Sequence, residues 1–448
     1  MTSIPAWGSS WFDDLDDAVR RDVLALGPRQ TVDSGGGLAT GGSRGHELVL
    51  VLSGTGRAVA GGRVVAHVGP GAFVGESFLG GGPNVATLVA ESPIDALVLD
   101  AAAFRALLRV PSATHELCRQ LVPRLRTADP ALELRAVGPD DLHVVCSLVN
   151  RSARHDGIPQ VQTVDELREL LEQDTIEPAL DTRVLLLDGE VVGWCYVLNP
   201  PAEVRLDRCI LGGVVDPDHR GKGIGTQLLA WAVERAVGRL AAHNHDLPRR
   251  IRVACYDWQA ADVRLYERFG FASTRWFEEL ARPLTDPPSV PEPDGIDLRP
   301  LPEGDDEEVR RARNVAFADH WGSEPVDASG WHTLVRGHGG RPDLSVIATE
   351  HATGEVVGIC VNHAYPDDDA VTGRREAWIN NVGTVPAWRG RGVASAMVAR
   401  SLAAFGAAGF THAVLSVDAD SVTGADRLYR ALGFEPVRRT VVHELEVP

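Results

Sequence analysis

Hydrophobic and polar positions change their spacing along the chain, and each change predicts a different kind of structure. In residues 11–26, apolar Leu15, Val19 and Leu24 recur among acidic residues as on one face of an amphipathic helix. Residues 45–99 instead contain short β-like runs, the first of which are separated by glycine-rich turns. The runs cover residues 47–52, 57–60, 64–67, 86–90 and 94–99, and helical stretches follow at 101–108 and 112–126. Closely spaced short strands with turn glycines predict a small β-roll or barrel.

Beyond a break at residues 127–130, the chain repeats itself. One unit opens at Leu134-Arg135 and another at Leu298-Arg299. Each unit predicts a helix, two apolar strands around a turn, a glycine-rich motif that opens a helix, a further strand and a Tyr-x-x-x-Gly-Phe segment. Repetition at this scale predicts two homologous domains rather than a solenoid.

Together these patterns predict an α+β multidomain chain. The β-roll with its flanking helices is expected over residues 1–130, and the two α/β domains, each with a mixed sheet, over 131–284 and 296–448. Residues 285–295 are rich in proline and acids, which is typical of a semi-rigid linker.

The glycine-rich motif reads GGVVDPDHRGKGIGTQLL at 212–229 and VGTVPAWRGRGVASAMV at 382–398. A strand that ends at Pro217 or Pro386 loses a ladder donor, so we expect its neighbour to splay and open a slot for an amide-bearing ligand arm. The glycines let the backbone approach a phosphate, and the helix N-terminus then holds a pyrophosphate. The predicted ligand-binding residues are Gly213, Val214, Val215, Arg220, Gly221, Lys222, Gly223, Ile224 and Gly225, and Gly383, Thr384, Val385, Arg389, Gly390, Arg391, Gly392, Val393 and Ala394. One such motif alone fits a functionless strand-to-helix turn equally well.

A second signal accompanies the motif in both units. Tyr266 and Tyr429 stand in Tyr-x-x-x-Gly-Phe, each on a predicted helix that ends at glycine. A single tyrosine of this kind is more often a core residue, but its recurrence after the same motif favours a position facing a ligand. A phenol with a reference pKa of about 10 can protonate a departing thiolate.

These motifs resemble the GNAT superfamily of N-acetyltransferases, in a tandem arrangement similar to that of the mycothiol synthases. The resemblance implies acetyl-CoA as cofactor, direct transfer to an amine of a small molecule or protein, and Tyr429 or Tyr266 as general acid. It suggests the second unit as the catalytic one, with Glu376 as base and Asp207 at the matching position of the first unit. The loop after the first helix of the second unit would select the substrate through Asp319, His320 and Trp321. A packed loop explains these last residues equally well.

Residues 71–87 are similar to the phosphate cassette of cyclic-nucleotide-binding domains. The resemblance places Gly75 and Glu76 at the nucleotide, but neutral Asn84 stands where that family has an arginine. Losing a charge-assisted pair to phosphate costs on the order of 1.5–3 kcal/mol, so we do not expect tight cyclic AMP binding. The β-roll is then a scaffold or a candidate regulator of the transferase.

The chain has 44 basic and 62 acidic residues, a net charge of −18, and Lys222 is its one lysine. This balance disfavours nucleic acid and weakly favours a cationic ligand. No apolar run reaches the ~20 residues of a membrane span, and the N-terminus does not resemble a signal peptide, so we expect a cytoplasmic protein. Six scattered cysteines indicate reduced thiols and no metal site. The alternatives to an enzyme are a non-catalytic sensor of acetyl-CoA or cyclic nucleotide and, less favoured, a transcription regulator.

Overall fold

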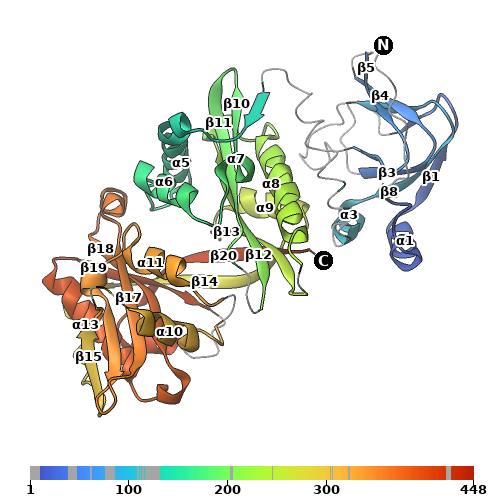
Figure 1. Cartoon of the computed structure of the whole chain (residues 1–448). Coiled ribbons are helices and arrows are strands. Elements are labelled where there is room, and N and C mark those ends of the chain that lie inside the picture. Colours follow the sequence, from blue (N-terminus) through green and yellow to red (C-terminus); the bar gives the residue numbers. More distant parts are fainter. Residues whose placement is uncertain are drawn as a thin grey trace.

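The computed structural model of the protein describes residues 11–38, 48–60, 63–75, 86–107, 110, 113, 116, 132–201, 205–244, 246–302, 304, 306–320, 323–419 and 425–447. Within these residues an N-terminal β-roll is followed by two α/β domains (Figure 1). The predicted α+β multidomain organisation is therefore confirmed.

The β-roll consists of two four-stranded antiparallel sheets. One contains β1 (Arg29–Val32), β8 (Ile94–Leu99), β3 (Leu48–Ser53) and β6 (Phe73–Val74), and the other β2 (Gly37–Leu38), β7 (Thr87–Ala90), β4 (Gly56–Ala60) and β5 (Arg63–Val68). Helices α1 (Asp17–Leu24) and α3 (Ala101–Leu107) flank the roll. Val49, Leu88 and Ala96 belong to the core shared by the two sheets, whereas Leu50 and Leu97 belong to a second core with Phe104 of α3. The first predicted helix is shorter than expected, because Asp16 caps it by accepting from the amides of Ala18 and Val19. The stretch predicted at 112–126 lies almost entirely outside the described residues.

The two α/β domains repeat one order of elements. The first contains β9 (Leu132–Arg135), α5 (Leu142–Asp156), α6 (Val164–Glu172), α7 (Pro178–Asp181), β10 (Thr182–Leu187), β11 (Glu190–Leu198), β12 (Asp207–Val215), α8 (Ile224–Ala241), β13 (Arg249–Tyr256), α9 (Ala260–Arg268) and β14 (Ala272–Pro283). The second contains β15 (Ile296–Pro300), α10 (Glu307–Ala316), α11 (Ala328–Arg336), β16 (Val346–Glu350), β17 (Val356–Ala364), α12 (Asp369–Thr372), β18 (Glu376–Thr384), α13 (Val393–Ala407), β19 (His412–Asp418), α14 (Ala425–Ala431) and β20 (Glu435–Val447).

One continuous sheet of twelve strands runs through both domains, in the order β15-β16-β17-β18-β19-β14-β20-β13-β12-β11-β10-β9. The last strand of each unit has changed sides: β14 pairs with β19 of the second domain, and β20 pairs with β13 of the first. The two exchanged strands also pair with each other, and Figure 1 shows them bridging the domains. The expected boundary at residue 284 thus separates the units along the chain, whereas the sheet joins them.

The exchange also determines what fills each core. Leu445 of β20 is buried among residues of α8 in the first domain, including Leu228 and Val233. Leu280 of β14 is buried against Met397 and other residues of α13 in the second domain. Each hydrophobic core is therefore completed by the other unit's terminal strand.

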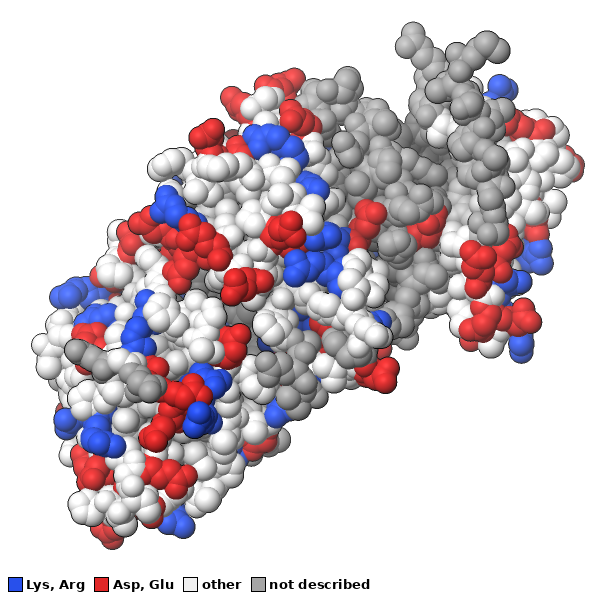
Figure 2. All heavy atoms as spheres, in the orientation of Figure 1, with Lys and Arg blue, Asp and Glu red and all other residues white. Residues whose placement is uncertain are grey.

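Three expectations from composition concern the distribution of charge, membrane-spanning helices and the state of the cysteines. On the face shown in Figure 2, Lys and Arg side chains lie in small groups interspersed with Asp and Glu. None of the helices in the described part of the chain is long and apolar enough to cross a membrane. The five cysteines within the described ranges are free and buried, as predicted: Cys146, Cys195, Cys209, Cys255 and Cys360.

Candidate active site

A slot opens in the sheet where two parallel strands separate. Strand β12 pairs with β13 only as far as Ile210 and Arg252, but continues to Val215 along β11 on its other side. In the second domain β18 likewise leaves β19 after Ile379 and continues along β17. The predicted splay is confirmed, but its predicted cause is wrong. Proline removes a hydrogen-bond donor only at its own position, and Pro217 lies well beyond the point where the strands part.

Each slot leads to a glycine turn that starts a helix. Gly221 and Gly223 have φ of +75° and +84°, and Gly390 and Gly392 have φ of +74° and +82°. This left-handed region strains other L-residues, so the glycines are required by the turn itself. Helices α8 and α13 begin immediately afterwards, with Gly223 and Gly392 as their N-caps. The first amides of each helix are thereby available to an anion.

The arginine of each motif is held by a carboxylate of its own domain. Arg220 donates from both terminal nitrogens to Asp156, at 2.6 and 2.8 Å, and Arg389 grips Asp319 in the same bidentate manner. These ion pairs hold the pKa of Asp319 below its usual range and raise the pKa of both arginines. Each guanidinium is thus ion-paired within its own domain, and its predicted role in adding positive charge at a phosphate stays a prediction.

The same pairing involves a residue of the predicted substrate loop. The carboxylate of Asp319 is paired with Arg389, and its side chain is 53% exposed. The ring of His320 packs against Phe317, with 5.5 Å between ring centroids. Trp321 lies outside the described residues. These contacts are those of a loop packed onto the glycine motif, and substrate selection by Asp319 and His320 stays a prediction.

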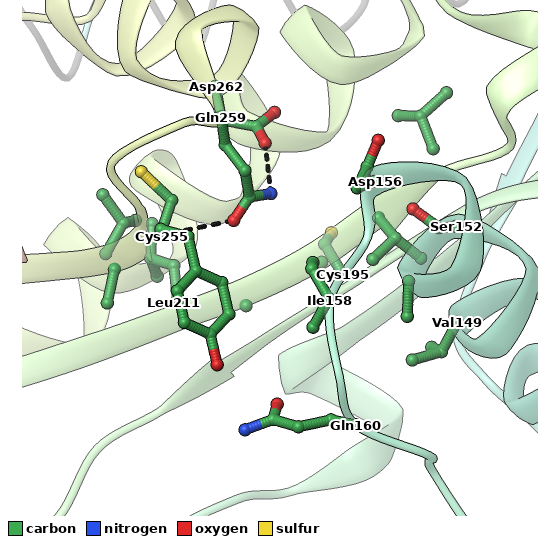
Figure 3. Close-up of a pocket in the computed structure, with 18 of the residues that line it drawn as sticks. Val149, Ser152, Asp156, Ile158, Gln160, Cys195, Leu211, Cys255, Gln259 and Asp262 are labelled. Carbon is green, nitrogen blue, oxygen red and sulfur yellow. Dashed lines mark hydrogen bonds between the residues drawn. The ribbon is translucent and has the colours of Figure 1, made fainter. Parts of the chain in front are cut away.

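A cavity of about 970 Å³ occupies the slot of the first domain. Its lining includes residues 211–215 of β12, residues 253–256 of β13, Gly221 and Gly223 of the turn, and Gly225 at the start of α8. Figure 3 shows the end of α5 and the loop after it, from Val149 to Gln160, facing Cys255, Gln259 and Asp262 across this space. Asn380 and Ser416, each the first residue of its strand beyond the β18–β19 pairing, also line the cavity, so it reaches the splay of the second domain.

The two tyrosines occupy different surroundings. Tyr266 lines the cavity and packs against His443 of the exchanged strand β20, with 5.5 Å between ring centroids. Tyr429 is 9% exposed, belongs to the core of the second domain and packs edge-on against Phe434. Burial raises the pKa of both phenols, so each stays protonated at neutral pH. Of the two, Tyr266 lies at the cavity.

Acidic residues gather where the second half of the chain meets this cavity. Glu166 of α6, Glu279 of β14 and Asp368 all line it, together with Tyr365. Asp368 ends a short 3-10 turn (Pro366–Asp368) and accepts a hydrogen bond of 2.6 Å from the amide of Val161 in the first domain. Burial, reinforced by Glu166 and Glu376, raises the pKa of Asp368 to about 6.

The partners of these acids are also defined. Glu279 accepts from the phenol of Tyr256 at 3.0 Å and from Arg438 at 2.7 Å. Glu166 lies 3.2 Å from the ring of His338. None of these residues stands in a recognisable motif, since contacts between the units bring them together. They are the functional candidates that the sequence did not reveal.

The carboxylates predicted as bases lie elsewhere. Glu376 is 5% exposed at the start of β18, 3.9 Å from Arg374, and is not among the residues that line the cavity. Burial raises the pKa of Glu376. Its counterpart Asp207 is fully buried and paired with His243 at 2.8 Å. The role of Glu376 stays a prediction, whereas Asp207 is closed off from any acceptor.

The β-roll carries the third predicted site. Gly75 is buried with φ of +97°, a conformation that favours glycine. Glu76 and Asn84 lie outside the described residues. Among the residues that are described, no group of three or more His, Cys, Asp and Glu is placed to hold a metal ion.

Known proteins match both parts of the chain. The profile of the acetyltransferase (GNAT) family matches residues 148–271 and 307–434, and that of the cyclic nucleotide-binding domain matches residues 30–110. Mycothiol acetyltransferase of Thermobispora bispora is 31% identical over 311 residues, which cover 66% of this chain and 93% of that protein. Mycothiol acetyltransferase of Streptomyces coelicolor is 27% identical over 324 residues, covering 70% and 93%.

Solved structures show the same architecture. A GCN5-related N-acetyltransferase from Sphaerobacter thermophilus superimposes with a TM-score of 0.57 at 27% identity, covering 71% of this chain and 97% of the other. A tandem GNAT protein from the clavulanic acid biosynthesis pathway has a TM-score of 0.52 at 19% identity, covering 70% and 98%, and shares the fold. The two α/β domains and their order are thus found together in other proteins.

Proposed function

Because the chain belongs to the GNAT family of acetyltransferases and carries two copies of its domain, we propose that it transfers acetyl from acetyl-CoA to an amine in the cavity of the first domain. The observation that carries this proposal is that one cavity joins a glycine turn at the start of α8, a protonated tyrosine and a group of carboxylates. The acceptor would be the amine of a small molecule or a protein.

In this proposal the cofactor arm follows the open edge of β12. The amides at the start of α8, cleared by Gly221 and Gly223, would hold the diphosphate. Backbone groups of Leu211–Val215 that face away from β11 would bind the amides of the pantetheine arm. Acetyl-CoA supplies the activated acetyl thioester. Tyr266 lines the same cavity and would donate its proton to the departing thiolate.

The amine would enter from the acidic side of the cavity. Glu166, Glu279 and Asp368 together favour a cationic acceptor over an anionic one. Asp368 is the best proton acceptor of the three. With a pKa of about 6 it is mostly ionised at neutral pH, yet basic enough to accept a proton. Glu279 is already held by Arg438 and Tyr256, so it would orient the amine.

The experiment compares the two tyrosines in thiol release from acetyl-CoA across a panel of amines. Tyr266→Phe should lower kcat about 10²–10⁴-fold, the range of general-acid catalysis, while Tyr429→Phe serves as the matched control. If Tyr429→Phe alone abolishes turnover, catalysis belongs to the second domain, as the resemblance to mycothiol synthases suggested. If the protein binds acetyl-CoA and no amine releases thiol, the non-catalytic sensor is the better description.

Asp368 gives an independent readout. The acid limb of kcat/KM should lie near pH 6, where this carboxylate loses its proton, and should disappear in Asp368→Asn. A limb that persists in the variant would assign the base elsewhere, with Glu376 the next candidate.

The β-roll would act as a scaffold or regulator of this activity. Its fold matches cyclic-nucleotide-binding domains, but Asn84 in place of an arginine argues against tight cyclic AMP binding. Free buried thiols favour a reducing compartment, which supports a cytoplasmic location. Titration of the full chain with cyclic AMP, followed by acetyltransferase assay, tests the regulatory role.

A further inference from the structure

Two arginines on α9 line the cavity beside the glycine turn. Arg264 and Arg268 are four residues apart, so their side chains leave the same face of the helix, about 6 Å apart at the Cβ atoms. Helix α9 lies against the start of α8, since a Cβ added to Gly225 would come within 3.4 Å of Leu265. The two arginines therefore line the same cavity as the turn that would hold the diphosphate, from a helix that packs against the start of α8.

Neither arginine is neutralised by an acidic side chain in the described part of the chain. Arg220, the other arginine lining the cavity, is paired with Asp156, whereas Arg264 and Arg268 form no ion pair with any described residue. The Nε of Arg268 is buried and has no hydrogen-bond partner within the described part of the chain. Burial, together with the positive charge of Arg264, lowers the pKa of Arg268. Two adjacent, uncompensated cations at a cavity wall are a costly arrangement that a bound anion would relieve.

The acidic residue of the same helix that lines the cavity is engaged with other groups and does not pair with these arginines. Asp262 is the acidic residue of α9 that lines the cavity, and its carboxylate accepts from the side chain of Gln259 at 2.8 Å. It interacts electrostatically with Arg220 and Asp156 on the other side of the turn. The second domain lacks the pair, because aligning Tyr266 with Tyr429 places Arg427 at the first position but Ala431 at the second.

We infer that Arg264 and Arg268 form a binding site for a phosphate monoester of the cofactor, separate from the diphosphate at the start of α8. This inference rests on the proposed function, since it assumes a CoA thioester in the first-domain cavity. Two guanidiniums offer several hydrogen-bond donors to the oxygens of a dianionic phosphate, whereas an ammonium acts as a point charge. The pair therefore suits the 3′-phosphate on the ribose of CoA. The site would make the first domain discriminate CoA from 3′-dephospho-CoA.

The test measures the affinity of the full chain for CoA and for 3′-dephospho-CoA by isothermal titration calorimetry. Hydrogen exchange at the start of α8 identifies the transition that belongs to the first domain. The wild-type protein should prefer CoA at this site by roughly tenfold to a hundredfold. In Arg264→Gln/Arg268→Gln the ratio should fall to about two or less, with the affinity for 3′-dephospho-CoA unchanged, which also shows that the variant is folded. Arg427→Gln should leave the ratio at this site as in the wild type.

Other outcomes have distinct meanings. Equal loss of affinity for both ligands, or a wild-type protein that does not discriminate, would overturn the inference and leave the transferase in place. If the double variant binds neither ligand, the ratio measured in each single variant decides in the same way. A wild-type protein that binds neither ligand at either glycine turn would overturn the proposed function itself.

Discussion

The strand exchange predicts that truncating a side chain of the second unit destabilises the first domain. The residue is Leu445, which lies on β20 of the second unit. Leu445 is 3% exposed and belongs to the core that contains α8. Replacing a buried leucine by alanine costs about 2–5 kcal/mol, through lost burial and the cavity left behind. Amides of α8 and β13 that exchange through opening of that domain should therefore exchange about 30-fold to several-thousand-fold faster in Leu445→Ala.

Hydrogen exchange followed by mass spectrometry measures this region by region. The matched control is Leu280→Ala on β14, which is fully buried in the core of the second domain although it precedes the linker. It should accelerate exchange in α13 and β18 instead. The reasoning is refuted if Leu445→Ala leaves α8 protected as in the wild type and loosens α13.

Three further predictions concern single side chains. Asp156→Asn breaks the bidentate pair that fixes the first glycine turn and should weaken acetyl-CoA binding roughly tenfold by calorimetry, whereas Asp319→Asn should leave the first-domain site unaffected. Burial raises the folded-state pKa of Asp368 to about 6, so ionisation of this carboxylate above that pH destabilises the folded protein. Asp368→Asn should therefore raise the thermal midpoint at pH 7.5, and this gain should vanish by pH 4, where the carboxylate is protonated in the folded protein. A lower midpoint of the variant at pH 7.5 would contradict the prediction. Burial raises the pKa of Cys209 and Cys360 to about 12, so iodoacetamide at pH 8 should label them only after unfolding, and rapid labelling of the native protein would show that they are accessible.

The elements that were predicted from sequence are those whose signals are local. The alternating strands of the β-roll, the glycines at positive φ and the helix starts at Ile224 and Val393 follow from residues that are neighbours along the chain. The tandem units follow from direct repetition of these signals. The separation of β12 from β13 was also predicted, although the cause assigned to it, the missing hydrogen-bond donor of Pro217, was wrong.

What could not be predicted depends on partners far apart in sequence. Arg220 is paired with Asp156, and nothing in the sequence marks that aspartate as its partner. The burial patterns of β14 and β20 would fit a strand in either domain, so the exchange is set by the whole sheet. Asp368 reaches the cavity only because the second unit packs against Val161 of the first.

The exchange also has a consequence for synthesis of the chain. The ribosome synthesises residues 435–447 after all the other strands of both domains, yet this segment is the strand that β13 requires as its neighbour. Until then the edge of β13 remains unpaired and the apolar residues beside it stay accessible to other chains. During translation, the first domain can therefore complete its sheet only after the second domain and β20 have been synthesised.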